Sequence, residues 1–332
     1  MNILILGLGS IGQRHLRNLR SIDKKLKFFT LRRRYITPLL DNKNRPKKGN
    51  IEKIYKIKNF KNFADVNGIH AAFICTPSKF HVSEALKLLK KDINLFIEKP
   101  LGSSLHEIDK LKKIILKKPK IKTMMGFQLK FNPLILKLKK LIESKSIGKI
   151  YNLFIHHGEH IDNFHPYENY KISYAAKKSL GGGVILTQIH EIDYLMFLFK
   201  DYKIKILHSF PSRISNLKID VEDNVVANLK LQNKKKQIIV CSLHLNYYEN
   251  PKKREIKLIG EKGKIECDLN KCEINIYKKN TLKKIKFKIN RNEIFKNQIK
   301  YFLSCVKNDR EIDQNFDVIN GIKSLTTALR LK

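Results

Sequence analysis

The first third of the chain alternates short apolar runs with amphipathic stretches. The apolar runs have the length of strands and cover residues 2–6, 26–31, 71–75, 95–97 and 123–127. Residues 71–75 are almost wholly apolar, as the central strands of parallel sheets are. After them, the stretch 81–90 carries its apolar residues at the spacing of one helical face. This alternation predicts an α/β fold built on a parallel sheet.

The remainder of the chain has a different pattern, in which alternating strands dominate. Apolar residues line one side of a predicted helix at 134–143, and another helix is expected over 183–199. Strands are predicted at 150–157, 204–210, 224–231, 237–245 and 254–260. A chain of 332 residues exceeds one ordinary core. We therefore expect two domains, 1–123 and 124–332, and a homodimer or homotetramer that covers the broad free face of the second sheet.

A glycine-rich segment follows the first predicted strand and opens a helix. Its sequence, Gly7-Leu8-Gly9-Ser10-Ile11-Gly12, matches G-x-G-x-x-G, which binds dinucleotides when it lies between a strand and a helix. The first glycine makes the turn, the second admits the pyrophosphate, and the third lets helix and strand pack closely. The helix N-terminus offers free N–H groups to the phosphates. A glycine-rich turn without a ligand is the alternative interpretation.

Basic residues follow the second predicted strand, at the place where proteins that prefer NAD usually offer a carboxylate to the ribose. Arg32 and Arg33 stand there instead, and guanidinium groups pair with phosphate through two parallel hydrogen bonds. We therefore expect NADP(H) as the preferred cofactor, with NAD(H) as the second choice. The alternative is one more basic loop in a basic protein.

Composition narrows the class of protein. Hydrophobic residues make up 42% of the chain and aromatic residues 9%, as in soluble globular proteins. No apolar run approaches the ~20 residues of a membrane span, and no signal peptide is recognisable, so we expect a cytoplasmic protein that binds no membrane. The five cysteines show no C-x-x-C spacing, so neither a disulfide framework nor a metal site is predicted.

The net charge of +38 raises the question of a polyanionic partner. The lysines recur along the whole chain and interleave with apolar residues, as the wet faces of helices and strands do. A specific nucleic-acid partner is therefore not expected, although a nucleic-acid binder remains the third functional hypothesis. The charge can instead attract an acidic substrate.

Four further motifs carry a resemblance to a known family. They are Arg14-His15 after the glycine loop, Thr76-Pro77 with His81 after it, Glu98-Lys99-Pro100, and Gly181-Gly182-Gly183 followed by His190-Glu191-Ile192-Asp193. Together and in this order they resemble the Gfo/Idh/MocA family, named for glucose-fructose oxidoreductase, inositol dehydrogenase and rhizopine catabolism. The resemblance implies an N-terminal Rossmann domain, a C-terminal α/β domain with a large open mixed β-sheet, and NAD(P)-dependent oxidation or reduction of a sugar or cyclitol.

The resemblance also implies which residues meet the cofactor beyond the glycine loop. These are Thr76, Pro77, His81, Glu98 and Lys99, with a cis peptide expected between Lys99 and Pro100. The chemistry of Lys99 can be argued independently, because hydride transfer leaves or meets a charged oxygen that a lysine at a strand end can protonate or deprotonate. Partial burial would lower its pKa and make it a usable acid or base. Glu98 either orients Lys99 or pairs elsewhere.

His190 is the second predicted catalytic residue, and the resemblance carries that assignment. Asp193 follows it by three positions, so the two side chains are expected to share a helix face toward the cleft. An imidazole, whose unperturbed pKa lies near neutrality, can pass the hydroxyl proton on or hydrogen-bond the substrate. The segment 166–183 resembles a branch linked to nucleotide-activated or surface-polysaccharide sugars. The predicted substrate contacts are Lys99, Tyr170, Tyr174, Thr187, His190 and Asp193.

The chain departs from the family three and four residues before His190. Most members carry an aspartate there, whereas this chain has Leu186 and Thr187. The missing carboxylate removes a charged hydrogen-bond acceptor from the sugar site. The main hypothesis is an NADP(H)-preferring sugar oxidoreductase, and the second is a family member that binds the cofactor without turnover.

Overall fold

The computed structural model describes residues 1–31, 38–42 and 44–332. The predicted 2′-phosphate contacts Arg32 and Arg33 lie outside the described residues. Within these ranges, no helix has the length and apolar character that a membrane crossing requires. The same described residues contain no cluster of three or more side chains suited to hold a metal ion.

The first sheet is wholly parallel, as predicted. Its order is β5-β2-β1-β6-β7-β8, and it consists of β1 (Asn2–Leu6), β2 (Lys27–Thr30), β5 (Lys58–Asn59), β6 (Ala71–Ile74), β7 (Asn94–Ile97) and β8 (Thr123–Met125). The strand order reverses between β1 and β6. Ligands of doubly wound sheets bind at the carboxyl ends of such a pair, so this reversal positions the site.

Helices cover both faces of the first sheet. They are α1 (Ser10–Ile22), α3 (His81–Leu89), α4 (Ile108–Lys117) and α8 (Arg291–Lys307), with the short α2 (Ile51–Tyr55) nearby. Side chains of β1 alternate, so Ile3 and Ile5 pack in the cluster that contains residues of α1 and α8, whereas Leu4 and Leu6 pack in the one that contains α3 and α4. Helix α8 belongs in sequence to the predicted second domain but packs on the first sheet.

The second sheet is large and mixed, as the resemblance implied. Its order is β10-β11-β12-β9-β13-β14-β15-β16, and only β9 and β12 pair in parallel. The strands are β9 (Ile150–Gly158), β10 (Tyr202–Ser212), β11 (Asn224–Asn233), β12 (Ile238–Asn246), β13 (Lys253–Gly260), β14 (Gly263–Asp268), β15 (Glu273–Lys278) and β16 (Thr281–Lys286). The last three strands were not predicted from the sequence.

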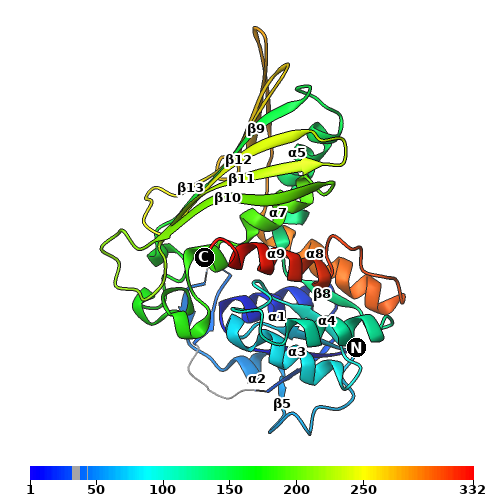
Figure 1. The fold of residues 1–332 in the computed structure, drawn as a ribbon. Coiled ribbons are helices and arrows are strands. Elements are labelled where there is room, and N and C mark those ends of the chain that lie inside the picture. Colours follow the sequence, from blue (N-terminus) through cyan, green and yellow to red (C-terminus); the bar gives the residue numbers. More distant parts are fainter. Residues whose placement is uncertain (32–37, 43) are drawn as a thin grey trace.

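Helices lie against one face of this second sheet (Figure 1). They are α5 (Pro133–Glu143), α6 (Val184–Thr187) and α7 (His190–Leu198), with α9 (Val318–Leu329) packed on α6 and α7. The other face keeps apolar side chains in solvent, since Phe154, Val226 and Val240 are 40%, 42% and 41% exposed. Short elements complete the chain: β3 (Leu39–Leu40), β4 (Pro46–Lys47) and the 3₁₀ turns 78–80, 128–131, 161–163, 170–172, 174–176 and 178–180.

The single helix expected over 183–199 is wrong, because the chain breaks it after Thr187. The N–H of Glu191 donates to the carbonyl of Gln188, so the regular pattern does not continue through the break. The side chain of Gln188 donates to the backbone carbonyl of Asn246, 3.0 Å away. This tertiary bond holds the break in place. Because the N–H of Glu191 bonds to Gln188, the carbonyl of Thr187 is available to another donor.

Candidate functional site

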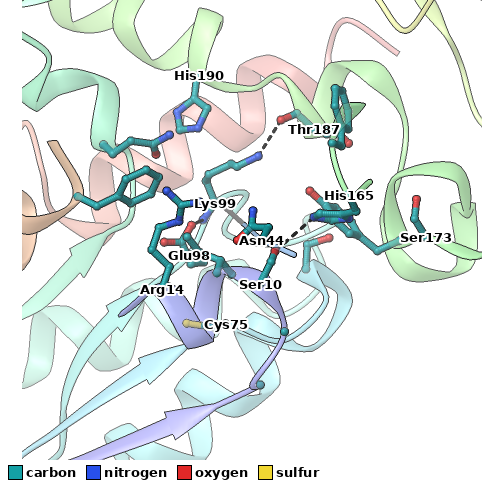
Figure 2. A pocket seen from close by; sticks show the side chains of 18 of the residues that line it. Ser10, Arg14, Asn44, Cys75, Glu98, Lys99, His165, Ser173, Thr187 and His190 are labelled. Atoms are coloured by element: carbon teal, nitrogen blue, oxygen red, sulfur yellow. Dashed lines mark hydrogen bonds between the residues drawn. The ribbon is translucent and has the colours of Figure 1, made fainter. Parts of the chain in front are cut away.

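A cavity of about 1290 Å³ lies where the carboxyl ends of the first sheet meet the second domain. Of the predicted site residues, those that line it are Gly7, Gly9, Ser10, Ile11, Thr76, Pro77, Glu98, Lys99, Tyr174, Thr187 and His190. Figure 2 shows Lys99 between the glycine-loop side of the cavity and His190. Of the predicted residues that the structure describes, four are not part of the lining: Gly12, His81, Tyr170 and Asp193.

The glycine loop has the geometry that a dinucleotide requires. Gly7 adopts φ +85°, and a Cβ there would lie 2.6 Å from the Cys75 carbonyl oxygen. A Cβ on Gly12 would lie 1.9 Å from the Gly7 carbonyl oxygen, so Gly12 serves helix–strand packing. A Cβ on Gly9 would meet nothing within 4 Å, which leaves room above the backbone. Because α1 begins at Ser10 without a side-chain cap, its first N–H groups suit the cofactor's pyrophosphate.

Glu98 fixes the end of β7 to the helix that follows the glycine loop. Its buried carboxylate lies 2.6 Å from Nε2 of His15 on α1, and it accepts the backbone N–H of Lys99 at 3.3 Å. A Cβ on Gly126 would lie 2.8 Å from the same carboxylate. Of the two roles left open for Glu98, the structure shows the pairing elsewhere, with His15, and the bond to the Lys99 backbone is compatible with the orienting role as well.

Lys99 follows β7 and points across the cavity toward α6. Its Nζ donates to the carbonyl of Thr187, 2.8 Å away, and its peptide bond to Pro100 is cis. Burial lowers the pKa of Lys99 to about 8, with Glu98 opposing the shift and Arg254 adding to it. An amine with this pKa can both release and accept a proton near neutral pH.

His190 opens α7 and is only 6% exposed. Its ring meets the ring of Phe127 edge-on at 5.8 Å, and Nδ1 has no hydrogen-bond partner among the described residues. Burial, followed by the charges of Lys99 and Arg254, holds the pKa of His190 well below its usual range. Of the two roles expected for His190, this shift favours a hydrogen bond to the substrate over proton transfer. His190 is a neutral ring whose Nδ1 awaits a hydrogen-bond partner.

Asp193 does not line the cavity that His190 lines, so the expectation that both side chains face the cleft is wrong. Its carboxylate lies 2.8 Å from Nζ of Lys130 and accepts hydrogen bonds from Ser324 at 3.0 Å and Asn320 at 3.2 Å. Ser324 and Asn320 belong to α9, which docks on this side of α7. With α9 docked here, Asp193 is buried and forms an ion pair with Lys130.

His81 and Tyr170 support the site from outside its lining. The two ring nitrogens of His81 lie 2.7 Å from the carbonyl oxygens of Pro100 and Thr76, so the ring joins the segments after β6 and β7. Burial lowers the pKa of His81. The hydroxyl of Tyr170 accepts the backbone N–H of Lys218 at 3.3 Å. Neither side chain lines the cavity, although a cofactor contact was expected for His81 and a substrate contact for Tyr170.

Several lining residues were missed by the sequence analysis. They include Arg14, His157, Glu159, His165, Arg254 and Arg291. His165 lies 3.4 Å from the Ser10 hydroxyl, and its other ring nitrogen lies 2.8 Å from the Glu168 carboxylate. The sequence did not distinguish these arginines from the many lysines of the chain. For Arg254 there was one signal, because it is a charged residue in a strand that was predicted to alternate.

Curated relatives match parts of the chain. It is 28% identical over 151 residues to a myo-inositol 2-dehydrogenase of Thermotoga maritima, which covers 45% of this chain and 42% of that protein. It is 22% identical over 206 residues to a 2,7-anhydro-N-acetylneuraminate hydratase of Mediterraneibacter gnavus, which covers 61% and 52%. The matches thus span about half of the length of these relatives.

Solved structures and family models cover more of the chain. A levoglucosan dehydrogenase in complex with NADH shares the fold with a TM-score of 0.79 and 15% identity, over 100% of this chain and 95% of that one. A myo-inositol 2-dehydrogenase from Lactobacillus plantarum gives 0.74 and 20%, over 100% and 96%. The model of an oxidoreductase family with an NAD-binding Rossmann fold matches residues 1–127, and that of the GFO/IDH/MocA C-terminal domain matches 135–266. The chain therefore belongs to the Gfo/Idh/MocA family of oxidoreductases.

Proposed function

We propose that the protein transfers a hydride between a nicotinamide cofactor and a carbinol or keto carbon of a sugar, cyclitol or nucleotide-activated sugar. One observation carries the proposal: Lys99, with a pKa of about 8, lies in the same cavity as the glycine loop and His190. Residues 1–123 would hold the cofactor and 124–332 the substrate. Segment 166–183 resembles a branch of the family that is linked to nucleotide-activated or surface-polysaccharide sugars, and this resemblance supports a role in surface-polysaccharide sugar metabolism.

The side chains divide the work of such a reaction. The nicotinamide supplies or accepts the hydride when the cofactor is bound. Neutral Lys99 takes the hydroxyl proton during oxidation, and protonated Lys99 returns it during reduction. The carbonyl of Thr187 holds the Lys99 Nζ in place. His190 hydrogen-bonds the substrate as a neutral ring, and Tyr174, whose pKa burial raises to about 12, stays protonated as a donor.

The pH dependence of turnover tests this proposal. We expect kcat/KM for sugar or cyclitol oxidation to rise with pH around a midpoint near 8, because only the neutral amine of Lys99 accepts a proton. The reverse reduction should fall through the same midpoint. A panel of sugars and cyclitols with NAD⁺ and NADP⁺, followed by the absorbance of the reduced nicotinamide, gives both profiles. Profiles that are flat around this midpoint would contradict the role of Lys99.

The preference for NADP(H) is a further part of the proposal and rests on the sequence at Arg32 and Arg33. Arg32→Ala and Arg33→Ala are each expected to weaken NADPH binding about tenfold or more, because a hydrogen bond to a charged group contributes about 1.5–3 kcal/mol. NADH binding should stay unchanged. Fluorescence titration with both cofactors measures the effect, and the exposed Arg310→Ala serves as the charge-matched control. Equal affinity of the unaltered protein for both cofactors would refute the preference.

A family member that binds the cofactor without turnover is the second candidate. The absence of the carboxylate before His190 favours it, since Thr187 lines the cavity and Leu186 is buried in the core. The positions of Lys99 and His190 in one cavity favour the enzyme. Cofactor-dependent oxidation of any sugar, abolished by Lys99→Met, excludes the second candidate.

A homodimer or homotetramer is also part of the proposal. The free face of the second sheet presents Phe154, Val226 and Val240 to solvent, with Phe210 57% exposed on β10. An apolar sheet face of this kind is typical of surfaces that pair with another protein. A second copy of this chain would cover it.

A further inference from the structure

The charged side chains that line the cavity are unevenly compensated. The acidic ones have partners: Glu98 contacts His15, Glu84 accepts from Thr76, Glu168 contacts His165, and Glu159 lies 3.7 Å from both His157 and Lys252. Among the described residues, neither Arg14 nor Arg291 has a carboxylate within ion-pair distance. The lining therefore holds two guanidinium groups without a direct ion pair among the described residues, and Glu159 and Glu98 act on Arg291 and Arg14 only from a longer distance.

Arg254 is held in the lining by buried groups. Its Nε donates to Oε1 of Glu191 at 2.6 Å, and the same carboxylate oxygen lies 3.1 Å from Nδ1 of His157. Glu191 is fully buried. One terminal nitrogen of Arg254 is also buried and has no partner among the described residues. A buried donor without a partner is unfavourable by about 1–3 kcal/mol, or more when charged. This nitrogen is closed off from solvent, as is Oε2 of Glu191, which has no partner among these residues either, but the Arg254 side chain as a whole is 18% exposed and lines the cavity, so a ligand there can reach it.

Several cationic side chains share the cavity with His190, since Lys99, Arg254 and Arg291 line it together with that ring. After burial, the charges of these three side chains contribute to holding the pKa of His190 well below its usual range. The residues just before His190 add no carboxylate to offset this charge, since Leu186 and Thr187 stand there. A negative group on the substrate would supply the missing compensation.

We propose that Arg254 and Arg291 form an anion-binding subsite beside Lys99 and His190, and that the substrate is a sugar bearing a carboxylate or a phosphate. A guanidinium presents paired donors that match both groups. Glu191 and His157 position Arg254 for this contact, and Arg291 adds a positive charge that has no direct ion pair among the described residues. This inference rests on the proposed function and narrows its substrate class.

Matched sugar pairs test the subsite in the NADP⁺-loaded protein. Titration calorimetry at fixed ionic strength compares glucose with glucuronate and glucose 6-phosphate, and galactose with galacturonate and galactose 1-phosphate. We expect an acidic sugar to bind at least about tenfold more tightly than its neutral partner. Tight binding of the uronates alone identifies a carboxylate as the recognised group, and tight binding of the phosphates alone identifies a phosphate.

Variants assign the preference to the two arginines. Arg291→Gln and Arg254→Gln should each reduce binding of the preferred acidic sugar about tenfold and leave the neutral partner unchanged. Arg310→Gln removes one exposed positive charge outside the lining and should change neither. If Arg254→Gln fails to fold because Glu191 loses its partner, Arg291→Gln still decides, since Arg291 makes no ion pair among the described residues.

Two results would overturn the subsite. One is that neutral sugars bind as tightly as their acidic partners, and the other is that no acidic sugar of the panel binds. Neither result touches the proposed function if the protein still binds NADPH and oxidises a neutral sugar in a reaction that needs Lys99. Loss of cofactor binding or of all Lys99-dependent turnover would instead count against the proposed function.

Discussion

Replacing Lys99 with methionine is expected to lower kcat by roughly 10²–10⁴-fold, the usual contribution of general acid–base catalysis. Methionine preserves an unbranched apolar stem but cannot exchange a proton. The Lys99 Nζ bonds only to the Thr187 carbonyl among the described residues, so its removal leaves the glycine loop and the Glu98–His15 pair in place. The NADPH dissociation constant should therefore change little.

Lys99→Arg separates the charge of the side chain from its proton chemistry. A guanidinium keeps the positive charge and donates hydrogen bonds, but it does not deprotonate at accessible pH. We expect Lys99→Arg to be nearly as slow as Lys99→Met and to lose the midpoint near 8. Steady-state kinetics across pH and NADPH titration measure both variants. A Lys99→Arg protein with full kcat would show that Lys99 acts as a charge only.

The first sheet could be predicted because its strands are buried on both faces and read as nearly unbroken apolar runs. Strand β16 was missed for the opposite reason. In β16 (Thr281–Lys286), all but one side chain is exposed and three are lysines, so no strict alternation marks the strand. Its place is set by pairing with β15. The sequence of such an edge strand carries little of the information that fixes it.

The candidate site likewise contains residues that the sequence predicted and residues that it did not. The glycine loop and Lys99 follow strand ends, so local patterns predicted them. Arg254 and His157 face each other because β13 and β9 pair in one register, across almost a hundred residues of sequence. A pattern within one segment does not specify that register. Asp193 shows the converse, since its spacing from His190 was read correctly but α9, far along the chain, decides what it contacts.

Removing the carboxylate of Asp193 is expected to destabilise the protein by about 3–5 kcal/mol, the usual effect of breaking a buried ion pair. The side chains of Lys130 and Asp193 are 1% and 2% exposed, so Asp193→Ala leaves an ammonium group buried without its counter-charge. Urea unfolding followed by circular dichroism measures the loss. Asp201→Ala, which removes a carboxylate from an exposed site, is the control and should change stability by less than about 0.5 kcal/mol.

The double variant Lys130→Met, Asp193→Leu completes the test. Replacing both members of a buried pair with apolar side chains removes the unpaired charge, so the double variant should be more stable than either single variant. A substrate-binding role for Asp193 makes a different demand, because it requires KM to rise in a protein of unchanged stability. Additive losses in the double variant would contradict the structural role that Ser324, Asn320 and Lys130 indicate. A rise in KM without destabilisation would contradict it too and would place Asp193 in the substrate site.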